Sequence, residues 1–137
     1  HHGVGANCGV GASDLVAAIL EMSEASTDGQ IIIAKANCGI PVVKGDQVVY
    51  TGTPELMARY VELALNAGAN IVGGCCGTSP EHLKAMRAAM DSYQPGERPS
   101  LQEIEEALGP YVNAVAAQAA TGDGAARRER SSRRRRA

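Results

Sequence analysis

One stretch decides how this chain folds: it reads ANIVGGCCGTSP and occupies residues 69–80. The apolar run before the two glycines predicts a buried strand. Ser79 and Pro80 predict the start of a helix, because serine caps helices and proline suits their first turn. Two adjacent thiols, Cys75 and Cys76, therefore lie where a strand gives way to a helix. The small residues beside them let a metal or a ligand approach the backbone.

Two further strands are predicted upstream of this stretch. Residues 3–7 form a short apolar run that ends at Cys8, and residues 30–37 carry three successive isoleucines before Cys38. A continuous β-branched run of this kind suits a strand of a parallel sheet that is covered on both faces. After Cys38 the valine pairs at residues 42–49, split by a polar turn, predict a small hairpin.

Helical periodicity follows each of the three strands. We expect Ser13 to cap the first helix and Thr53 to cap the second, since both precede apolar residues at helical spacing. In the third helix we expect Leu83, Met86 and Met90 to form the buried stripe. The chain therefore alternates strand and helix three times, which predicts an α/β fold with parallel pairing and right-handed crossovers.

Three strand–helix units cannot close a barrel, and they leave strand edges exposed. We therefore interpret the chain as a piece of a longer protein. We place the strand–helix units at residues 1–93 and a helical extension at residues 94–120. An Arg-rich tail at residues 121–137 is expected to be disordered, because its composition offers nothing to form a core.

Length, composition and charge limit the classes of protein to which this chain can belong. The 137 residues carry a net charge of −2 and no Phe or Trp, so the core must be aliphatic. No apolar run approaches the roughly 18 residues of a membrane span, and no secretory signal is visible. We expect a cytoplasmic protein. Its four cysteines are then reduced, and Cys75 and Cys76 could bridge each other only through a strained ring.

All three strands carry a thiol at the same end. The carboxyl ends of parallel strands meet at one edge of a sheet, which is where active sites of α/β barrels lie. We expect Cys8, Cys75 and Cys76 to converge there and to bind zinc. Zinc takes thiolate ligands at roughly 2.3 Å, and a fourth position left open would accept a thiol substrate. Such a thiol loses its proton near neutral pH and becomes a nucleophile.

The same residues resemble a known family. GANC at residues 5–8 and GGCCGT at residues 73–78 are similar to the two zinc signatures of the homocysteine S-methyltransferase family. NCGIP at residues 37–41 is similar to the Asn-x-Gly-x-Pro turn between them. The GERP segment at residues 96–99 and the Arg-rich end look most like betaine–homocysteine S-methyltransferase-type members. The resemblance is strong over residues 3–92.

The resemblance implies the fold and the activity. The fold would be a (β/α)₈ TIM barrel, of which this chain carries the sixth, seventh and eighth units and lacks the first five. Cys8, Cys75 and Cys76 would bind Zn²⁺, with no catalytic residue beyond these ligands. Homocysteine sulfur would attack the methyl group of an onium donor such as betaine, and methionine would form. Without the missing units the piece itself is expected to be inactive.

Other residues near the strand ends have two interpretations each. Asn7 and Asn37 would either stabilise turns or contact the substrate, and Gly74 is a further candidate for substrate binding. Cys38 is either a fourth ligand or a wall of the pocket, and we favour the wall. His82 lies in the first turn of its helix, where we expect a solvated side chain.

Two other functions fit parts of the chain. The glycine-rich loop at residues 73–78 before a helix also suits phosphate binding by an isomerase or synthase of the same barrel class. It leaves the paired thiols unexplained. Residues 127–137 hold seven Arg and one Glu and would suit RNA binding on an inert scaffold. We favour a solvated end without nucleic acid, and residues 100–120 would suit a docking arm in a homo-oligomer.

Overall fold

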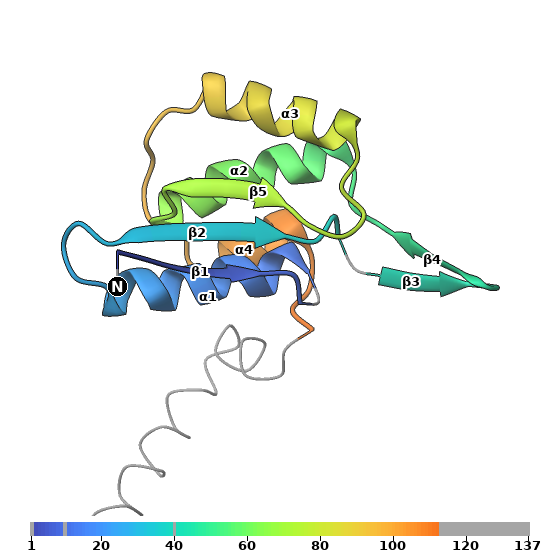
Figure 1. The fold of residues 1–137 in the computed structure, drawn as a ribbon, viewed down its shortest axis with the longest axis horizontal. Helices are drawn as coiled ribbons and strands as arrows, with labels where there is room; N and C mark the ends of the chain where they lie inside the picture. Colours follow the sequence, from blue (N-terminus) through green and yellow to red (C-terminus); the bar gives the residue numbers. More distant parts are fainter. Residues whose placement is uncertain (1, 10, 40, 113–137) are drawn as a thin grey trace, which may run out of the picture.

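The structure is a computed structural model that describes residues 2–9, 11–39 and 41–112 (Figure 1). Its elements in chain order are β1 (Gly3–Asn7), α1 (Ala12–Ala25), β2 (Ile31–Ala36), β3 (Pro41–Lys44), β4 (Gln47–Tyr50), α2 (Pro54–Ala67), β5 (Ile71–Gly74), α3 (Pro80–Asp91) and α4 (Leu101–Leu108). The predictions for the Arg-rich tail and for the end of the helical extension lie outside the described residues.

Three strands form a parallel sheet in the order β1-β2-β5, with β2 at its centre. Lys35 on β2 lies opposite Asn7 on β1 and Gly73 on β5. The order of strands and helices along the chain and the parallel pairing confirm the predicted α/β class. Because the strands are parallel, the residues that follow β1, β2 and β5 all leave the sheet at one edge.

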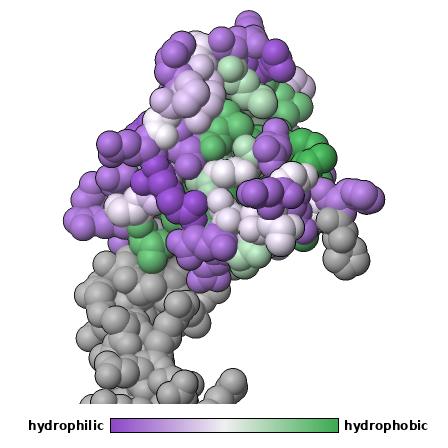
Figure 2. Space-filling model, turned by 90° about the vertical axis from the view of Figure 1, so that its left-hand side faces the viewer, coloured by the Kyte–Doolittle hydropathy of each residue, from purple (hydrophilic) through white to green (hydrophobic). Residues whose placement is uncertain are grey.

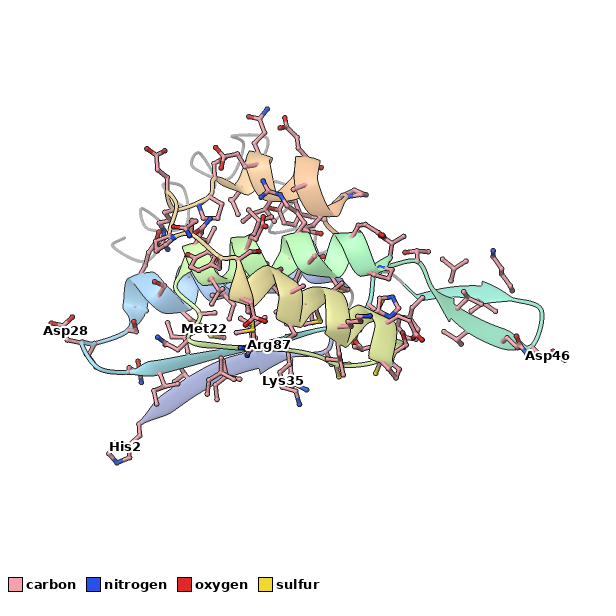
Figure 3. The ribbon with its side chains drawn as sticks, turned by 90° about the horizontal axis from the view of Figure 1, so that it is seen from above. His2, Met22, Asp28, Lys35, Asp46 and Arg87 are labelled. Atoms are coloured by element: carbon pink, nitrogen blue, oxygen red, sulfur yellow. The ribbon has the colours of Figure 1, made fainter. Side chains whose placement is uncertain are left out.

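Helices cover one face of this sheet. Helices α1 and α2 pack against the strands, α3 packs against α2, and all three lie on the same side (Figures 1 and 3). The strand residues that face the helices are small or β-branched, and Ile32, Ala34 and Ala36 are buried there. Alanine at two of these positions lets the helix backbones come close to β2. The core is therefore aliphatic, as the composition requires.

The opposite face of the sheet is open among the described residues. Ile31 and Ile71 are 43% and 51% exposed, and the Lys35 side chain points away from the helices (Figure 3). We predicted that β2 would be covered on both faces, but nothing in the described part of the chain packs on this side. At the end of the molecule away from the hairpin, polar and apolar side chains mix on the surface (Figure 2).

Strands β3 and β4 form the predicted hairpin, which projects from the edge of the sheet where β2 ends (Figure 1). Its valines are exposed on both strands. At its root the chain enters and leaves through two glycines in close contact. Gly39 has φ 79°, and a Cβ there would overlap the backbone of Gly52. The Gly52 N–H also donates to the Cys38 carbonyl at 3.0 Å.

Helix starts were predicted correctly where the capping signal is local. Thr53 caps α2, and its Oγ1 accepts from the Leu56 N–H at 3.1 Å. The prediction for Ser13 is wrong, because the N-cap of α1 is Gly11, two residues earlier, and the helix begins at Ala12. Ser13 is buried inside the helix, where its hydroxyl donates to the Pro110 carbonyl at 3.4 Å. A distant segment of the chain therefore uses the hydroxyl that the sequence suggested as a cap.

The buried stripe of α3 also differs from the prediction. Met86 is buried and Met90 is partly buried, but Leu83 is 51% exposed. The helix packs on α2, where Met86 and Ala89 are buried, whereas Leu83 in its first turn is left half exposed. No helix in residues 2–9, 11–39 and 41–112 is both long enough and apolar enough to cross a bilayer.

The segment after α3 folds back on the helical layer. Ser100 and Glu103 form a capping box at the start of α4, as expected for a helix over these residues. Ile104 and Leu108 are buried where α4 meets α1 and α2. Before α4, the Arg98 guanidinium donates to a carbonyl of α1 at 2.6 Å. The described part of the predicted helical extension thus packs on the outer side of the same helices that cover the sheet.

Candidate metal centre

Three of the four cysteines meet over the carboxyl end of β2. Cys8 follows β1, and Cys75 and Cys76 follow β5. The Cys8 and Cys76 sulfurs are 3.7 Å apart, the Cys75 and Cys76 sulfurs are 4.0 Å apart, and all three lie within 4.8 Å of one another. Sulfurs bound tetrahedrally to one zinc ion would be separated by about 3.8 Å. The spacing of this thiol cluster therefore suits a shared metal.

Backbone hydrogen bonds to β2 hold both thiol loops in place. The Cys8 N–H donates to the Lys35 carbonyl at 2.9 Å, and the Cys75 N–H donates to the Ala36 carbonyl at 2.8 Å. Cys8 has φ 62°, which makes it the only residue other than glycine with a positive φ in the described part of the chain. Such a conformation is strained for an L-residue, and strained residues cluster at functional sites.

Gly74 is required by packing in the loop that carries Cys75 and Cys76. A Cβ at Gly74 would overlap the side chain of Thr78. Thr78 Oγ1 is itself buried and has no hydrogen-bond partner among the described residues. Close packing explains the glycine without a ligand, so its role in substrate binding stays a prediction.

The sulfurs influence one another's ionisation. The neighbouring Cys76 thiol lowers the pKa of Cys8 through a hydrogen bond, and the Gly9 N–H adds to this effect. Conversely, the Cys8 and Cys75 sulfurs raise the pKa of Cys76. Three adjacent thiolates repel one another, so a full set of thiolates needs a cation between them. A divalent metal fits that requirement.

Cys38 lies outside this group. Its side chain is 0% exposed, and its thiol donates to the Gly52 carbonyl at 3.0 Å. Burial raises the pKa of the Cys38 thiol, which favours its neutral form. Its backbone N–H donates to the Cys76 carbonyl at 2.9 Å. Cys38 thus supports the loop that carries the thiol cluster.

The two asparagines at the strand ends have different surroundings. Asn37 is 2% exposed, its Nδ2 donates to the Gly9 carbonyl at 2.7 Å, and a hydrogen bond from its side chain helps to lower the pKa of Cys8. Its Oδ1 is buried and has no partner among the described residues. A buried acceptor is normally satisfied, so this unpaired oxygen beside the thiol cluster is unusual, and a role of Asn37 in substrate binding stays a prediction. Asn7 lies on the open face beside Lys35 and is exposed.

His82 is not the solvated residue that we predicted. Its Nδ1 accepts from the Ser79 N–H at 3.1 Å and lies 2.6 Å from Ser79 Oγ, while its Nε2 lies 2.8 Å from the Gly52 carbonyl. These contacts require the neutral tautomer with the proton on Nε2. His82 occupies the third helical position after a serine cap, where a capping box places its second partner. That spacing is the signal that sequence reasoning missed.

Taken together, fold and site define an α/β protein with a three-cysteine group able to hold a metal. The family model described as homocysteine S-methyltransferase matches residues 1–90, which is well over half of the chain. The chain therefore belongs to the homocysteine S-methyltransferase family, as its motifs indicated. Membership implies a function of the homocysteine S-methyltransferase type.

Proposed function

We propose that this chain carries the zinc centre of a homocysteine S-methyltransferase, which moves a methyl group from an onium donor such as betaine to homocysteine. The observation that carries the proposal is the thiol cluster, with sulfur separations of 3.7 and 4.0 Å. Family membership supports homocysteine as the methyl acceptor, since the matching family is named for it. Cys8, Cys75 and Cys76 would hold the metal, one ligand short of the four that zinc usually takes.

When bound, zinc supplies a positive charge that favours the deprotonated form of a thiol near neutral pH. The chain supplies the rest of the arrangement. Cys8 and Cys75 are fixed by their hydrogen bonds to β2, so the cluster is preorganised. Asn37 Nδ2 donates to the Gly9 carbonyl at 2.7 Å and so steadies the loop that carries Cys8. The Cys38 thiol donates to the Gly52 carbonyl and lies outside the cluster.

The transfer itself is a displacement at carbon. The homocysteine sulfur gives an electron pair to the methyl carbon, and the bond from that carbon to the donor nitrogen breaks. Its electron pair stays on nitrogen, so betaine leaves as a tertiary amine and methionine forms. A sulfonium donor fits the same step with sulfur in place of nitrogen. Because the reaction changes no oxidation state of the metal, zinc suits it.

We also propose that the described sheet forms strands six, seven and eight of a (β/α)₈ barrel. Support comes from the one-sided helical layer and from the exposed Ile31 and Ile71 on the other face, which would turn toward a barrel interior. The thiol cluster then lies at the carboxyl end of the strands, where barrel enzymes carry their sites. Five further strand–helix units would complete the pocket, and the chain without them is expected to be inactive.

Zinc analysis of the purified 137-residue chain tests the proposal. We expect about one tightly held zinc per chain, lost in Cys8→Ser and retained in the matched control Cys38→Ser. A chain that binds no zinc would overturn the proposal. If such a chain retained inorganic phosphate, the phosphate-binding alternative would gain support. A longer polypeptide that contains this chain and completes the barrel should convert homocysteine and betaine to methionine only when zinc is bound.

A further inference from the structure

Tyr50, the last residue of β4, lies against the thiol cluster. A Cβ added to Gly77 would overlap the Tyr50 ring, so the ring packs directly on the turn that follows Cys76. Its hydroxyl also lies near enough to the Cys76 sulfur for each group to influence the pKa of the other. Nothing in the sequence pattern distinguished this tyrosine from a packing residue. The structure places both its ring and its hydroxyl at the loop that carries Cys76.

We propose that Tyr50 is a positioning residue of the metal centre: its hydroxyl holds the Cys76 sulfur in the orientation that a shared metal requires. This inference rests on the proposed function, because it assumes that the thiol cluster binds a metal. Groups that hydrogen-bond a metal ligand orient it, and their loss typically weakens metal binding 10–100-fold. Tyr50 is a group of that kind for Cys76.

Cys76 is the ligand with the greatest need of such support. It is the most exposed of the three cysteines, whereas Cys8 and Cys75 are partly buried. Their backbone N–H groups bond β2 directly, while the carbonyl of Cys76 accepts from the N–H of Cys38, two residues beyond β2. The turn continues through Gly77 with φ 76°. A hydroxyl donor on the sulfur therefore restricts a side chain that the backbone restrains least.

The His82 side chain connects the root of the hairpin, which carries Tyr50, to the end of the thiol loop. Its Nε2 bonds the carbonyl of Gly52, two residues beyond Tyr50, and its Nδ1 accepts from Ser79, three residues beyond Cys76. One side chain thus joins the root of the hairpin to the end of the thiol loop. The rest of the hairpin projects from the body (Figure 1), so this bridge and the hydrogen bonds of Cys38 to Gly52 and Cys76 join its root to the thiol loop.

The test compares Co²⁺ binding by the whole chain, Tyr50→Phe and Tyr93→Phe. Co²⁺ is the probe because thiolate–cobalt bonds absorb light, so the spectrum reports the geometry of the sulfurs. Tyr50→Phe removes only the hydroxyl and keeps the ring on Gly77. Tyr93→Phe is the matched control, because the Tyr93 hydroxyl bonds Asn66 near the opposite end of α2. Affinity is measured by competition with a chelator.

For Tyr50→Phe we expect an unchanged melting temperature, about 10–100-fold weaker Co²⁺ binding and a shifted sulfur-to-cobalt absorption band. Tyr93→Phe should bind Co²⁺ like the unaltered chain. If Tyr50→Phe matches the unaltered chain in both affinity and spectrum, the inference is wrong and the metal centre stands. If the unaltered chain binds no metal, the proposed function fails, and the inference fails with it.

A second variant tests the bridge. His82→Ala removes both contacts to Gly52 and Ser79 but leaves every cysteine in place. We expect the same shift of the cobalt band as in Tyr50→Phe and a weaker Co²⁺ affinity. In the double variant the two effects should not add, since His82 acts through the position of Tyr50. Additive effects would show that His82 does not work through Tyr50.

Discussion

The thiol cluster and Cys38 show how differently the same side chain behaves at the ends of neighbouring strands. All four cysteines follow strands of one parallel sheet. The three of the cluster have sulfurs within 4.8 Å of one another, at or near the surface. Cys38 is fully buried, and its thiol donates to the Gly52 carbonyl. A cysteine that follows a strand is therefore available to a metal site only if its thiol is not already donating to a backbone carbonyl.

Removing one thiol of the cluster should have the largest effect. We expect Cys75→Ala to weaken zinc binding by about a thousandfold, because one ligand of three would carry about 4 kcal/mol of a total of about 12 kcal/mol. The measurement is chelator competition on the whole chain. Full-strength zinc binding by this variant would mean that the cluster is not the metal site, and the contrast with Cys38 would lose its meaning.

A smaller effect is expected where Cys38 meets the hairpin root. Gly39→Ala places a Cβ against the Gly52 backbone at a positive φ, so we expect about 2–4 kcal/mol lower stability in urea unfolding. The matched control is Gly45→Ala in the hairpin turn, with φ 62° but open space around it. It should lose only about 1 kcal/mol. Equal losses would show that close packing at the root is unimportant.

Cys38→Ala should lower the stability of the fold and leave metal binding unchanged. Loss of the buried sulfur and its hydrogen bond to Gly52 should lower the free energy of unfolding by about 1–2 kcal/mol. Zinc stoichiometry should stay at the value of the unaltered chain, because the sulfur lies outside the cluster. Zinc loss in a folded Cys38→Ala chain would instead make Cys38 a fourth ligand.

The smallest effect is the order in which thiols react in the metal-free chain. The pKa of Cys8 is lowered and that of Cys38 is raised, so iodoacetamide should modify Cys8 first and Cys38 last as pH rises. Peptide mass spectrometry reads the order. Because the pKa of Cys38 is raised in the folded chain, the contribution of its thiol to the free energy of unfolding is complete below the ordinary pKa of 9.0. That contribution declines as pH rises through the folded pKa. Early modification of Cys38 would contradict its burial.

Much of the fold could be predicted because its signals are local. The apolar runs of β1, β2 and β5, the valine hairpin, and the caps at Thr53 and Ser79 each depend on residues a few positions apart. Convergence of the thiol cluster also followed from the sequence, since parallel strands bring their carboxyl ends to one edge. The structure brings these sulfurs to within 4.8 Å of one another, close to the separation of about 3.8 Å in a shared tetrahedral zinc site.

What could not be predicted depends on distant partners. Ser13 looked like a cap, but the carbonyl it bonds belongs to Pro110, 97 residues away. His82 looked solvated because its acceptor, Gly52, lies at the root of a hairpin that only the folded chain brings near. For Asn37 the sequence suggested a turn or a substrate contact. Only the structure shows that its oxygen is buried and without a partner among the described residues.

The positive φ of Cys8 lowers the stability of the fold at a residue that the proposed activity needs. With φ 62°, this residue holds a conformation that glycine adopts without penalty, so Cys8→Gly should make the metal-free folded chain more stable by about 1 kcal/mol. The same change deletes a sulfur that the proposed chemistry needs. Selection for thermal resistance alone would therefore drift toward glycine at this position, and only selection for methyl transfer would keep the cysteine.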